Sequence, residues 1–470
     1  MANKRPFSIS TLQNLSNDTK NTSMRTVATR LGNAKLFLRE DYEAVDPNLP
    51  GLLRVLRDRG AGECSHKHGT FYEHLLHVYR MLKLWDAPNP VALCGLFHSA
   101  YSNSYVNLAI FEPNVERRTV RDLVGEAAEE LIHFFCIVPR QQLIFTNLLF
   151  TLSDERLLST LHEYDQIMGG DKTGSAAATP NQYETVGKAT HDHFVVSKKM
   201  EQLFSTDVNS HSGARRPEPL IPSEGMLVKH IHTGEDVWVP RRVVAIFLLL
   251  TMADFADQLF GWQDVLFGND DGEFRFNGNN FYALWPGNCK PGLWMTEISR
   301  MGVLLNVLLK EDEVENREEH QSAGKREGKK AFSELQIPLP AIFKSCSAIV
   351  SAADQIKARN LYWEAICITG GDEKILDKAQ PLLQAACKYN PFVGEPHIVL
   401  AQILLSRREF ELAEKEATLG LQLLLEWATN WDKRMTWEGW VAWARVLRQN
   451  ALDKTWAKDV WGIINLGLVK

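Results

Sequence analysis

Histidines and aspartates stand at three places in the chain where a metal ion could be bound. His74, His98 and Asp254 each lie in or beside a strongly apolar stretch. A buried imidazole or carboxylate costs free energy unless it has a partner, so each of the three needs one inside the fold. Imidazole nitrogens and carboxylate oxygens are also ligands of divalent metals. If the three side chains converge they form a metal site; the alternative is a buried polar network that fixes helix packing without metal.

A capped helix is expected to carry the first histidine. Thr70 and Glu73 have the spacing of a capping box, which predicts that a helix covers about 71–85. Apolar residues recur along this stretch at helical spacing, and His74 lies one turn before Val78 on the same face. His74 should therefore point into the core.

Two further helices, apolar on nearly every face, are expected to carry the other candidate ligands. One begins at Asn89 and contains His98. The other covers about 241–260 and contains Asp254, with Asp257 one turn away. Helices of this composition are buried. The sequence therefore predicts that three helices bring potential ligands toward one point.

The remaining segments before residue 310 complete a helical domain with a small β insert. An amphipathic helix is expected at 119–135, and a β-hairpin is expected at 226–242, where apolar residues alternate around a turn. Residues 165–225 are rich in Gly, Ser, Thr and Pro, which predicts a loop-rich insert. We expect this domain to span 46–309.

A charged stretch is expected to link this domain to a second helical one. Residues 310–335 begin with 13 charged side chains in 21 positions, a composition typical of a solvated linker. Beyond the linker, 336–470 is expected to be helical, and Ala379 aligns with Ala413 34 residues later, the tetratricopeptide period. The stretch 360–428 resembles tetratricopeptide repeats, which implies a surface for a protein partner. An unrelated array of helical hairpins is the alternative.

The stretch HLLHVYRMLKLW followed by PVALCGLFHSAY resembles the start of an HD domain, the all-helical fold of a superfamily of metal-dependent phosphohydrolases. His74 stands where that pattern has its first histidine, and His98 where it has the histidine of a His-Asp doublet. Asp254, in TMADFADQ, stands where the pattern has its distal aspartate. More closely, these stretches and RTVRDLVGEAAEELIHFF resemble an uncharacterised domain family at the edge of the HD group. The resemblance implies that the three residues hold a divalent metal: Mg, Mn, Fe or Zn.

Ser99 departs from the HD pattern, because it stands where the doublet has its aspartate. A neutral hydroxyl is a poor metal ligand, which leaves three. Either a mononuclear hydrolytic site with open positions survives, or His77, Asp257 or Glu126 substitutes for the missing ligand. Asp257 and Glu126 are accordingly candidate catalytic carboxylates, and Arg118 is a candidate clamp for a substrate phosphate. Arg118 lies among other arginines at a predicted helix start, where a simple solvated position is the alternative.

The leading functional hypothesis is a divergent HD-type metal-dependent hydrolase of a phosphorylated or nucleotide-like small molecule. The metal would lower the pKa of a bound water and polarise the phosphoryl oxygen. The alternative is a catalytically inactive HD-like module for ligand sensing or scaffolding, with the repeats binding a protein partner. A di-iron oxygenase on the same scaffold ranks last, since it needs more histidine and carboxylate ligands than the chain offers.

Composition restricts the classes of function. The chain has 470 residues, 52 basic and 58 acidic, and a net charge of −6 argues against a nucleic-acid binder that acts through a broad basic surface. No apolar run reaches the about 20 residues of a membrane-spanning helix. Seven widely spaced cysteines without a CxxC pair favour a reducing intracellular compartment, with the cytoplasm as default. Residues 1–45 are expected to be a disordered tail, or to carry an organelle-targeting segment within 1–30.

Two pairs of closely spaced histidines are expected to be incidental to any site. His66 with His68 precede the first predicted helix, and His230 with His232 lie in the predicted hairpin. Such pairs can bind metal, but in a loop or on a short strand they need further ligands that the local sequence does not supply.

Overall fold

The computed structural model describes the chain except residues 1–26, 67–68, 104–108, 113–114, 170–216, 259–263, 265–270, 272–289, 322–331, 333, 369–373 and 467–470. In the described residues the protein is mostly helical, with two small antiparallel hairpins, which confirms the all-α class. The elements up to the long helix α12 are, in chain order, α2 (Tyr42–Val45), α3 (Leu49–Asp58), β1 (Ser65–His66), β2 (Gly69–Thr70), α4 (Phe71–Leu84), α5 (Asn89–Leu96), α6 (Arg117–Val124), α7 (Glu126–Ile137), the π-helix η1 (Gln141–Leu149), α8 (Asp154–Gly169), β3 (Met226–Lys229), β4 (Asp236–Val239), α10 (Arg241–Asp257) and α12 (Met295–Gln321).

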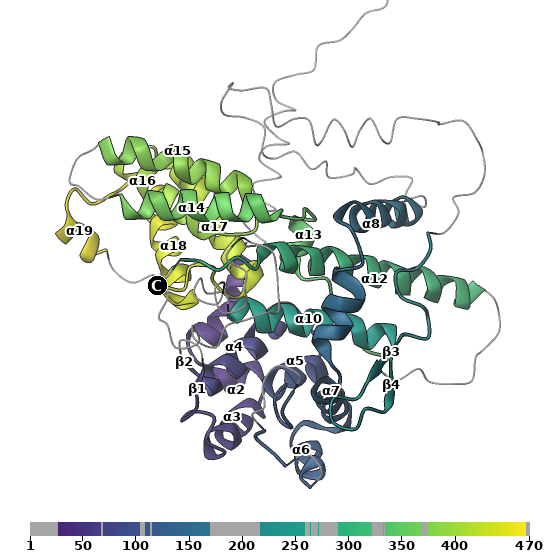
Figure 1. Cartoon of the computed structure of the whole chain (residues 1–470). Coiled ribbons are helices and arrows are strands. Elements are labelled where there is room, and N and C mark those ends of the chain that lie inside the picture. The colour runs from purple at the N-terminus through teal and green to yellow at the C-terminus, as the bar shows by residue number, and fades with distance from the viewer. Residues whose placement is uncertain are drawn as a thin grey trace, which may run out of the picture.

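The helix α10 is the centre of the N-terminal part. Nearly all of its side chains are buried, as its uniformly apolar sequence predicts. The helices α4, α5 and α12 contact it, and Figure 1 shows α10 in the middle of the molecule between α4 and α12. A buried polar side chain on α10 is therefore not hydrated by solvent and needs hydrogen-bond or charge partners inside the protein.

The predicted tail is shorter than expected, because residues 27–38 are helical. Val27, Ala34 and Phe37 of this helix are buried. Their spacing of seven and three places them on one helix face, which gives the segment an apolar stripe to pack. The expectation of a tail reaching residue 45 was therefore wrong for its second half, and residues 1–26 lie outside the described residues.

The helix predicted over 119–135 is two helices, α6 and α7. They meet at Gly125, whose φ of 86° lies in the left-handed region that only glycine adopts readily. The predicted β-hairpin is confirmed by the pairing of β3 with β4, in which Leu227 lies opposite Trp238. The hairpin β1–β2 was not predicted, since strands of two residues have no alternation to detect. The predicted insert at 165–225 lies largely outside the described residues.

The C-terminal helices pack in chain order. They are α13 (Ala341–Ser345), α14 (Ala352–Cys367), α15 (Lys374–Tyr389), α16 (Glu395–Ser406), α17 (Phe410–Trp427), α18 (Trp437–Leu452) and α19 (Val460–Ile464). From α14 to α18 each helix contacts the next, forming the layer at the upper left of Figure 1. Gly420 permits a close approach of α17 to α16, because a Cβ there would lie 2.6 Å from Ile398 Cγ1. The helical array is confirmed, and its resemblance to tetratricopeptide repeats stays a prediction.

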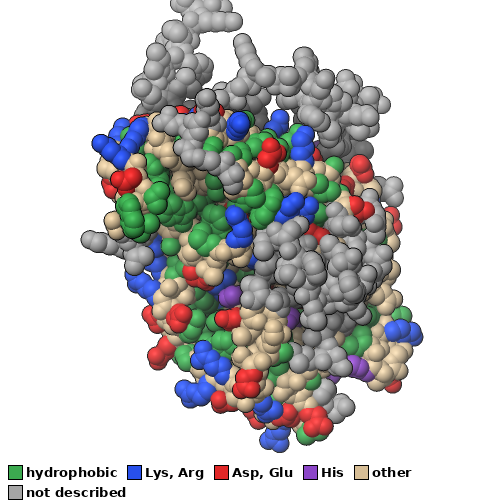
Figure 2. Space-filling model, turned by 60° about the vertical axis from the view of Figure 1, so that its left-hand side comes forward, with side chains coloured by type: hydrophobic (Ala, Val, Ile, Leu, Met, Phe, Trp, Pro, Cys, Tyr) green, Lys and Arg blue, Asp and Glu red, His purple; other side chains and the backbone are tan. Residues whose placement is uncertain are grey.

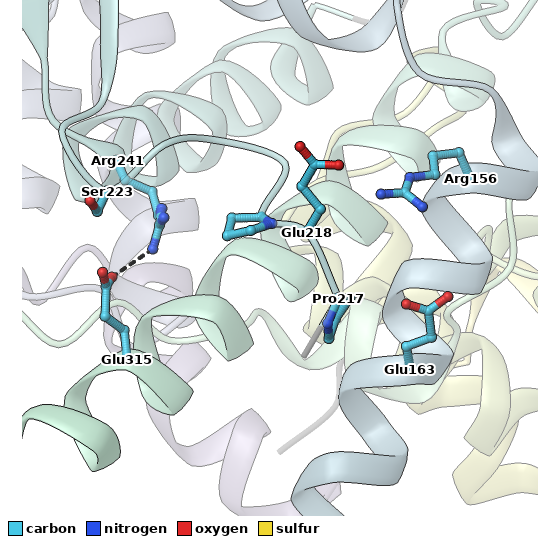
Figure 3. Close-up of a pocket in the computed structure, with 8 residues that line it drawn as sticks. Arg156, Glu163, Pro217, Glu218, Ser223, Arg241 and Glu315 are labelled. Atoms are coloured by element: carbon cyan, nitrogen blue, oxygen red, sulfur yellow. Dashed lines mark hydrogen bonds and ion pairs between the residues drawn. The ribbon is translucent and has the colours of Figure 1, made fainter. Parts of the chain in front are cut away.

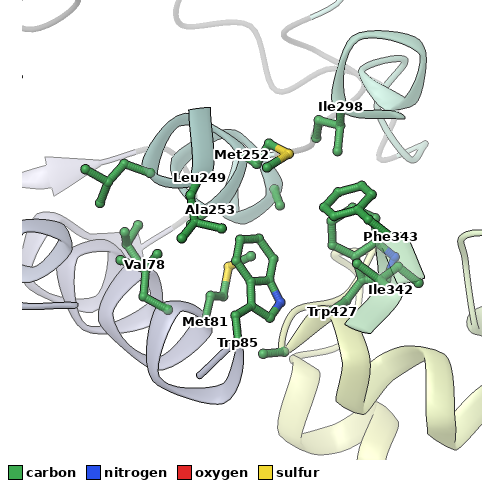
Figure 4. Close-up of a cluster of buried hydrophobic side chains, with 14 of the residues drawn as sticks. Val78, Met81, Trp85, Leu249, Met252, Ala253, Ile298, Ile342, Phe343 and Trp427 are labelled. Carbon is green, nitrogen blue, oxygen red and sulfur yellow. The ribbon is translucent and has the colours of Figure 1, made fainter. Parts of the chain in front are cut away.

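The N-terminal and C-terminal helices share one hydrophobic core. Figure 4 shows side chains of α4 and α10 meeting Phe343 of α13 and Trp427 of α17. Trp85, which follows α4, lies with its ring 6.4 Å from that of Trp427 and donates from Nε1 to Glu426 O at 2.9 Å. The C-terminal array is therefore packed directly on the N-terminal helices.

The first half of the charged stretch is part of a helix and not a linker. Residues 310–321 complete α12, and Glu311 is fully buried. Arg241 at the start of α10 explains this burial, since its guanidinium lies 2.8 Å from Glu315 Oε2 and 3.7 Å from Glu311 Oε2. Opposite charges from another helix allow a run of acidic residues to face the interior.

Two surface properties bear on the predicted function classes. No helix in the described ranges is long and apolar enough to cross a membrane. On the face of the molecule shown in Figure 2, acidic and basic side chains are interspersed and do not gather into areas of one sign. This mixture is what the small net charge predicts.

We expect Arg241→Met to lower the free energy of unfolding by about 3–5 kcal/mol, because it leaves Glu311 buried without its cation. The control is Arg317→Met, which removes an exposed pair with Glu313 on the same helix and should cost no more than about 0.5 kcal/mol. Urea unfolding of both variants measures the difference. Equal effects would show that 310–321 does behave as a solvated segment.

Candidate metal centre

The capping box fixes His74 at the start of α4. The Thr70 side chain accepts from the Glu73 amide, and the Glu73 carboxylate accepts from the Thr70 amide, as predicted. His74 follows directly in the first turn and is buried. Its ring bonds two carboxylates: Nδ1 lies 2.8 Å from Asp257 Oδ2, and Nε2 lies 3.2 Å from Asp254 Oδ1.

His98 lies just beyond the helix on which it was predicted. The helix α5 ends at Leu96, and His98 occupies the following turn. Its Nδ1 lies 2.8 Å from Gly95 O, so Nδ1 carries the proton and satisfies a carbonyl at the helix end. Burial lowers the pKa of His98 to about 4, which keeps the ring neutral. Its Nε2 is therefore left with a lone pair directed away from α5.

Asp254 and Asp257 project from one face at the C-terminal end of α10 and are both buried. One ligand atom from each of His74, His98 and Asp254 lies within 4.8 Å of the others. These three buried residues could hold a metal ion, and they are the three that the sequence predicted. Asp257 lies behind His74 and also bonds His77, whose Nδ1 is 3.1 Å from Asp257 Oδ1.

The donor set fits a divalent metal. Metal-binding histidines commonly donate their second ring proton to a carboxylate or a backbone carbonyl, which fixes the tautomer. His74 has such a bond to Asp257 and His98 has one to Gly95 O. Two imidazole nitrogens and one carboxylate oxygen then converge, a set that suits several first-row transition metals and leaves further coordination positions open.

Arg140 was not predicted, and it connects Ser99 to the centre. Its fully buried guanidinium lies 3.6 Å from Asp254 Oδ2 and donates to Asn103 Oδ1 at 3.2 Å. Asn103 in turn donates to Ser99 Oγ at 2.6 Å. Ser99, which stands where the HD pattern has a negatively charged aspartate, therefore accepts a bond from the neutral amide of Asn103. That amide in turn accepts from the cation of Arg140. The π-helix η1 begins directly after Arg140, and π-helical turns are frequent next to functional sites.

When no metal ion is bound between His74, His98 and Asp254, the neighbouring carboxylates favour a protonated His74. Burial lowers the pKa of His74, but the bonds to Asp254 and Asp257 outweigh it and raise the pKa to about 9. Burial raises the pKa of both carboxyls, yet His74 beside Asp254 and His77 beside Asp257 hold both pKa values below the usual range. The proton on His74 Nε2 and a metal ion therefore compete for the same position, between His74 Nε2 and the carboxylate of Asp254.

The other predicted site residues lie apart from this centre. Glu126 and Arg118 are exposed at the starts of α7 and α6, and neither bonds a residue of the centre in the part of the chain described. The neighbouring Arg117 and Arg121 both bind the buried carboxylate of Glu129. Two of the arginines near this helix start therefore form ion pairs with a buried glutamate of the protein itself.

His66 was expected to be incidental, but it lies against the centre. Its ring centroid is 4.6 Å from that of His74. The only signal in the sequence was its position just before the capping box, and the hairpin β1–β2 that brings it back over α4 left no pattern to detect. His68 lies outside the described residues, and His230 occupies the turn after β3, where its Nδ1 accepts from His232 N at 3.1 Å.

A hollow lies at the opposite end of α10 from the histidine centre. It has a volume of about 890 Å³ and is lined by residues of both charge signs, among them Arg156, Glu163 and Glu218 (Figure 3). Arg241 in this hollow is engaged by Glu315, as the dashed line in the figure marks. None of the predicted site residues lines it, so the histidine centre is the better candidate for chemistry.

With a chelator present, we expect the protein to lose about 3 kcal/mol of stability as the pH rises from 6.5 to about 9 because of His74. The folded pKa of His74 is about 9 and lies above its unfolded value, so its contribution is complete below pH 6.5 and fades as the ring loses its proton. Urea unfolding across this range should show a flatter profile for His74→Gln. The variant His162→Gln, on the exposed face of α8, should keep the wild-type slope.

Part of the N-terminal half matches a family model. The family model of a domain of unknown function, DUF6817, matches residues 55–140. This range includes His74, His98 and Arg140 but not Asp254. No curated protein and no solved structure matches the chain. Residues 55–140 are therefore similar to this domain of unknown function, and the matched stretch contains two of the three candidate metal ligands.

Proposed function

We propose that the protein is a divergent HD-type metal-dependent hydrolase acting on a phosphorylated or nucleotide-like small molecule. The observation that carries the proposal is the convergence of His74, His98 and Asp254 in a buried centre, with both rings already bonded on their far side. A metal bound there would activate water and polarise a phosphoryl oxygen. Magnesium, manganese, iron and zinc are all compatible with such a donor set.

The remaining side chains have distinct parts in this proposal. Asp257 orients His74 and is a positioning residue, because both of its oxygens are engaged by imidazoles. His77 is about 30% exposed, and with Nδ1 bonded to Asp257 its other nitrogen can exchange a proton with a bound substrate. The bond from His74 is the main interaction that keeps Asp254 ionised, and Arg140 adds to it from the buried side. The roles predicted for Glu126 and Arg118 gain no support from their exposed positions.

We expect the chelator-treated protein to bind about one equivalent of Mn²⁺ or Zn²⁺ in a calorimetric titration. The variant His98→Gln should weaken that binding at least about 100-fold, since losing a direct ligand exceeds the cost of losing an outer partner. His162→Gln is the matched control and should bind as the wild type does. Hydrolysis of phosphomonoester and phosphodiester model substrates should require the metal and should fall in parallel in His98→Gln.

A second candidate function is favoured by one observation. The two carboxylates are already balanced by Arg140 and by a protonated His74, so the centre can be stable as a metal-free packing network. The protein would then be an inactive HD-like module for ligand sensing or scaffolding, and its C-terminal array would bind a protein partner. Absence of metal binding in the wild type, together with a loss of stability in His98→Gln, would select this candidate over the hydrolase.

A further inference from the structure

The connection between α17 and α18 is a rigid part of the C-terminal array. The buried carboxylate of Glu395 accepts from the backbone amides of Trp431 and Asp432, at 2.5 and 3.1 Å. Asn430 donates to the carbonyls of Asp432 and Met435, at 2.7 and 2.8 Å. A loop with this many internal bonds holds its side chains in fixed directions.

The side chain of Lys433 extends from this loop to the C-terminal end of α10. Its Nζ donates to Ala256 O and to Thr429 Oγ1, both at 3.1 Å. Ala256 directly precedes Asp257 in the chain. The ammonium group of Lys433, from the C-terminal array, is therefore bonded to the backbone next to an aspartate of the centre. The side chain is half-buried. An ammonium group has three protons, and these two bonds use two of them.

Two other cations of the described residues near the centre already have carboxylate partners. Arg80 binds Glu438 at 2.5 Å and its guanidinium stacks on the Trp437 ring at 4.5 Å. Arg140 is fully buried behind Asp254. Lys433, by contrast, is half-buried and bonds the backbone next to Asp257, the aspartate that His77 bonds; His77 is half-buried too. These two side chains define a side of the centre that solvent can reach.

We propose that Lys433 is the anion-binding residue of this centre and that it contacts a phosphate group of the substrate with its third ammonium proton. The inference rests on the proposed function, which it extends by making the C-terminal array part of the site. An ammonium beside a metal site attracts a phosphate and repels the metal. Its removal therefore moves the affinities for these two ligands in opposite directions.

The variant Lys433→Gln tests this, because a glutamine amide can still donate to Ala256 O while the charge is lost. We expect inorganic phosphate to bind the Mn²⁺-loaded variant about 10–100-fold more weakly than the loaded wild type. Mn²⁺ itself should bind the variant at least about threefold more tightly. Lys433→Arg should restore both affinities to within about threefold of the wild type. Lys458→Gln, an exposed site on the same array, should change neither.

The outcomes separate the two proposals. If the wild type binds no Mn²⁺, the proposed function fails and this inference fails with it. If the wild type binds Mn²⁺ but Lys433→Gln keeps the wild-type phosphate affinity, only the assignment of Lys433 is wrong. If both phosphate and Mn²⁺ bind more weakly, Lys433 serves only to cap α10, because a structural defect lowers both affinities together.

Discussion

The structure depends on two carboxylates that lie at the end of an otherwise apolar helix. Asp254 and Asp257 are buried where α10 passes through the middle of the molecule, so they have no water to solvate them. An uncompensated buried charge destabilises a protein by several kcal/mol, about 3–5 in measured cases. His74 and Arg140 lie against Asp254, and His74 and His77 bond Asp257. Helix α4 and the segment just before η1 must therefore both be in place before these charges are balanced.

Lys433 adds a polar contact to the interface between the C-terminal array and the N-terminal helices. The same interface that brings Lys433 to Ala256 also contains the contact of Trp85 with Trp427 and the ion pair of Arg80 with Glu438. Apolar packing buries surface at this interface, and the charged contacts give it a defined register. A protein partner of the array would therefore bind a surface that is rigidly connected to the candidate centre.

The sequence predicted those features that leave a local pattern. The capping box located α4 and His74, the apolar composition of α10 required partners for Asp254, and alternation located β3 and β4. The residues it missed act over long distances. Arg140 is 114 positions from Asp254, and nothing near it in sequence distinguishes a buried guanidinium from a solvated one. Glu311 was assigned to a linker for the same reason, because its cation, Arg241, lies on a different helix.

The arrangement of charges also determines how a metal ion would change the centre. Without metal, the imidazolium of His74 lies between the two carboxylates and Arg140 lies beside Asp254, with the His74 proton on Nε2 directed at Asp254. A divalent ion bound by His74, His98 and Asp254 must displace that proton, so the centre gains one positive charge and not two. This gain falls beside Lys433, on the side that solvent reaches. An anionic phosphate would offset it, and in the proposed site metal and phosphate would therefore stabilise each other even though Lys433 alone would disfavour the metal.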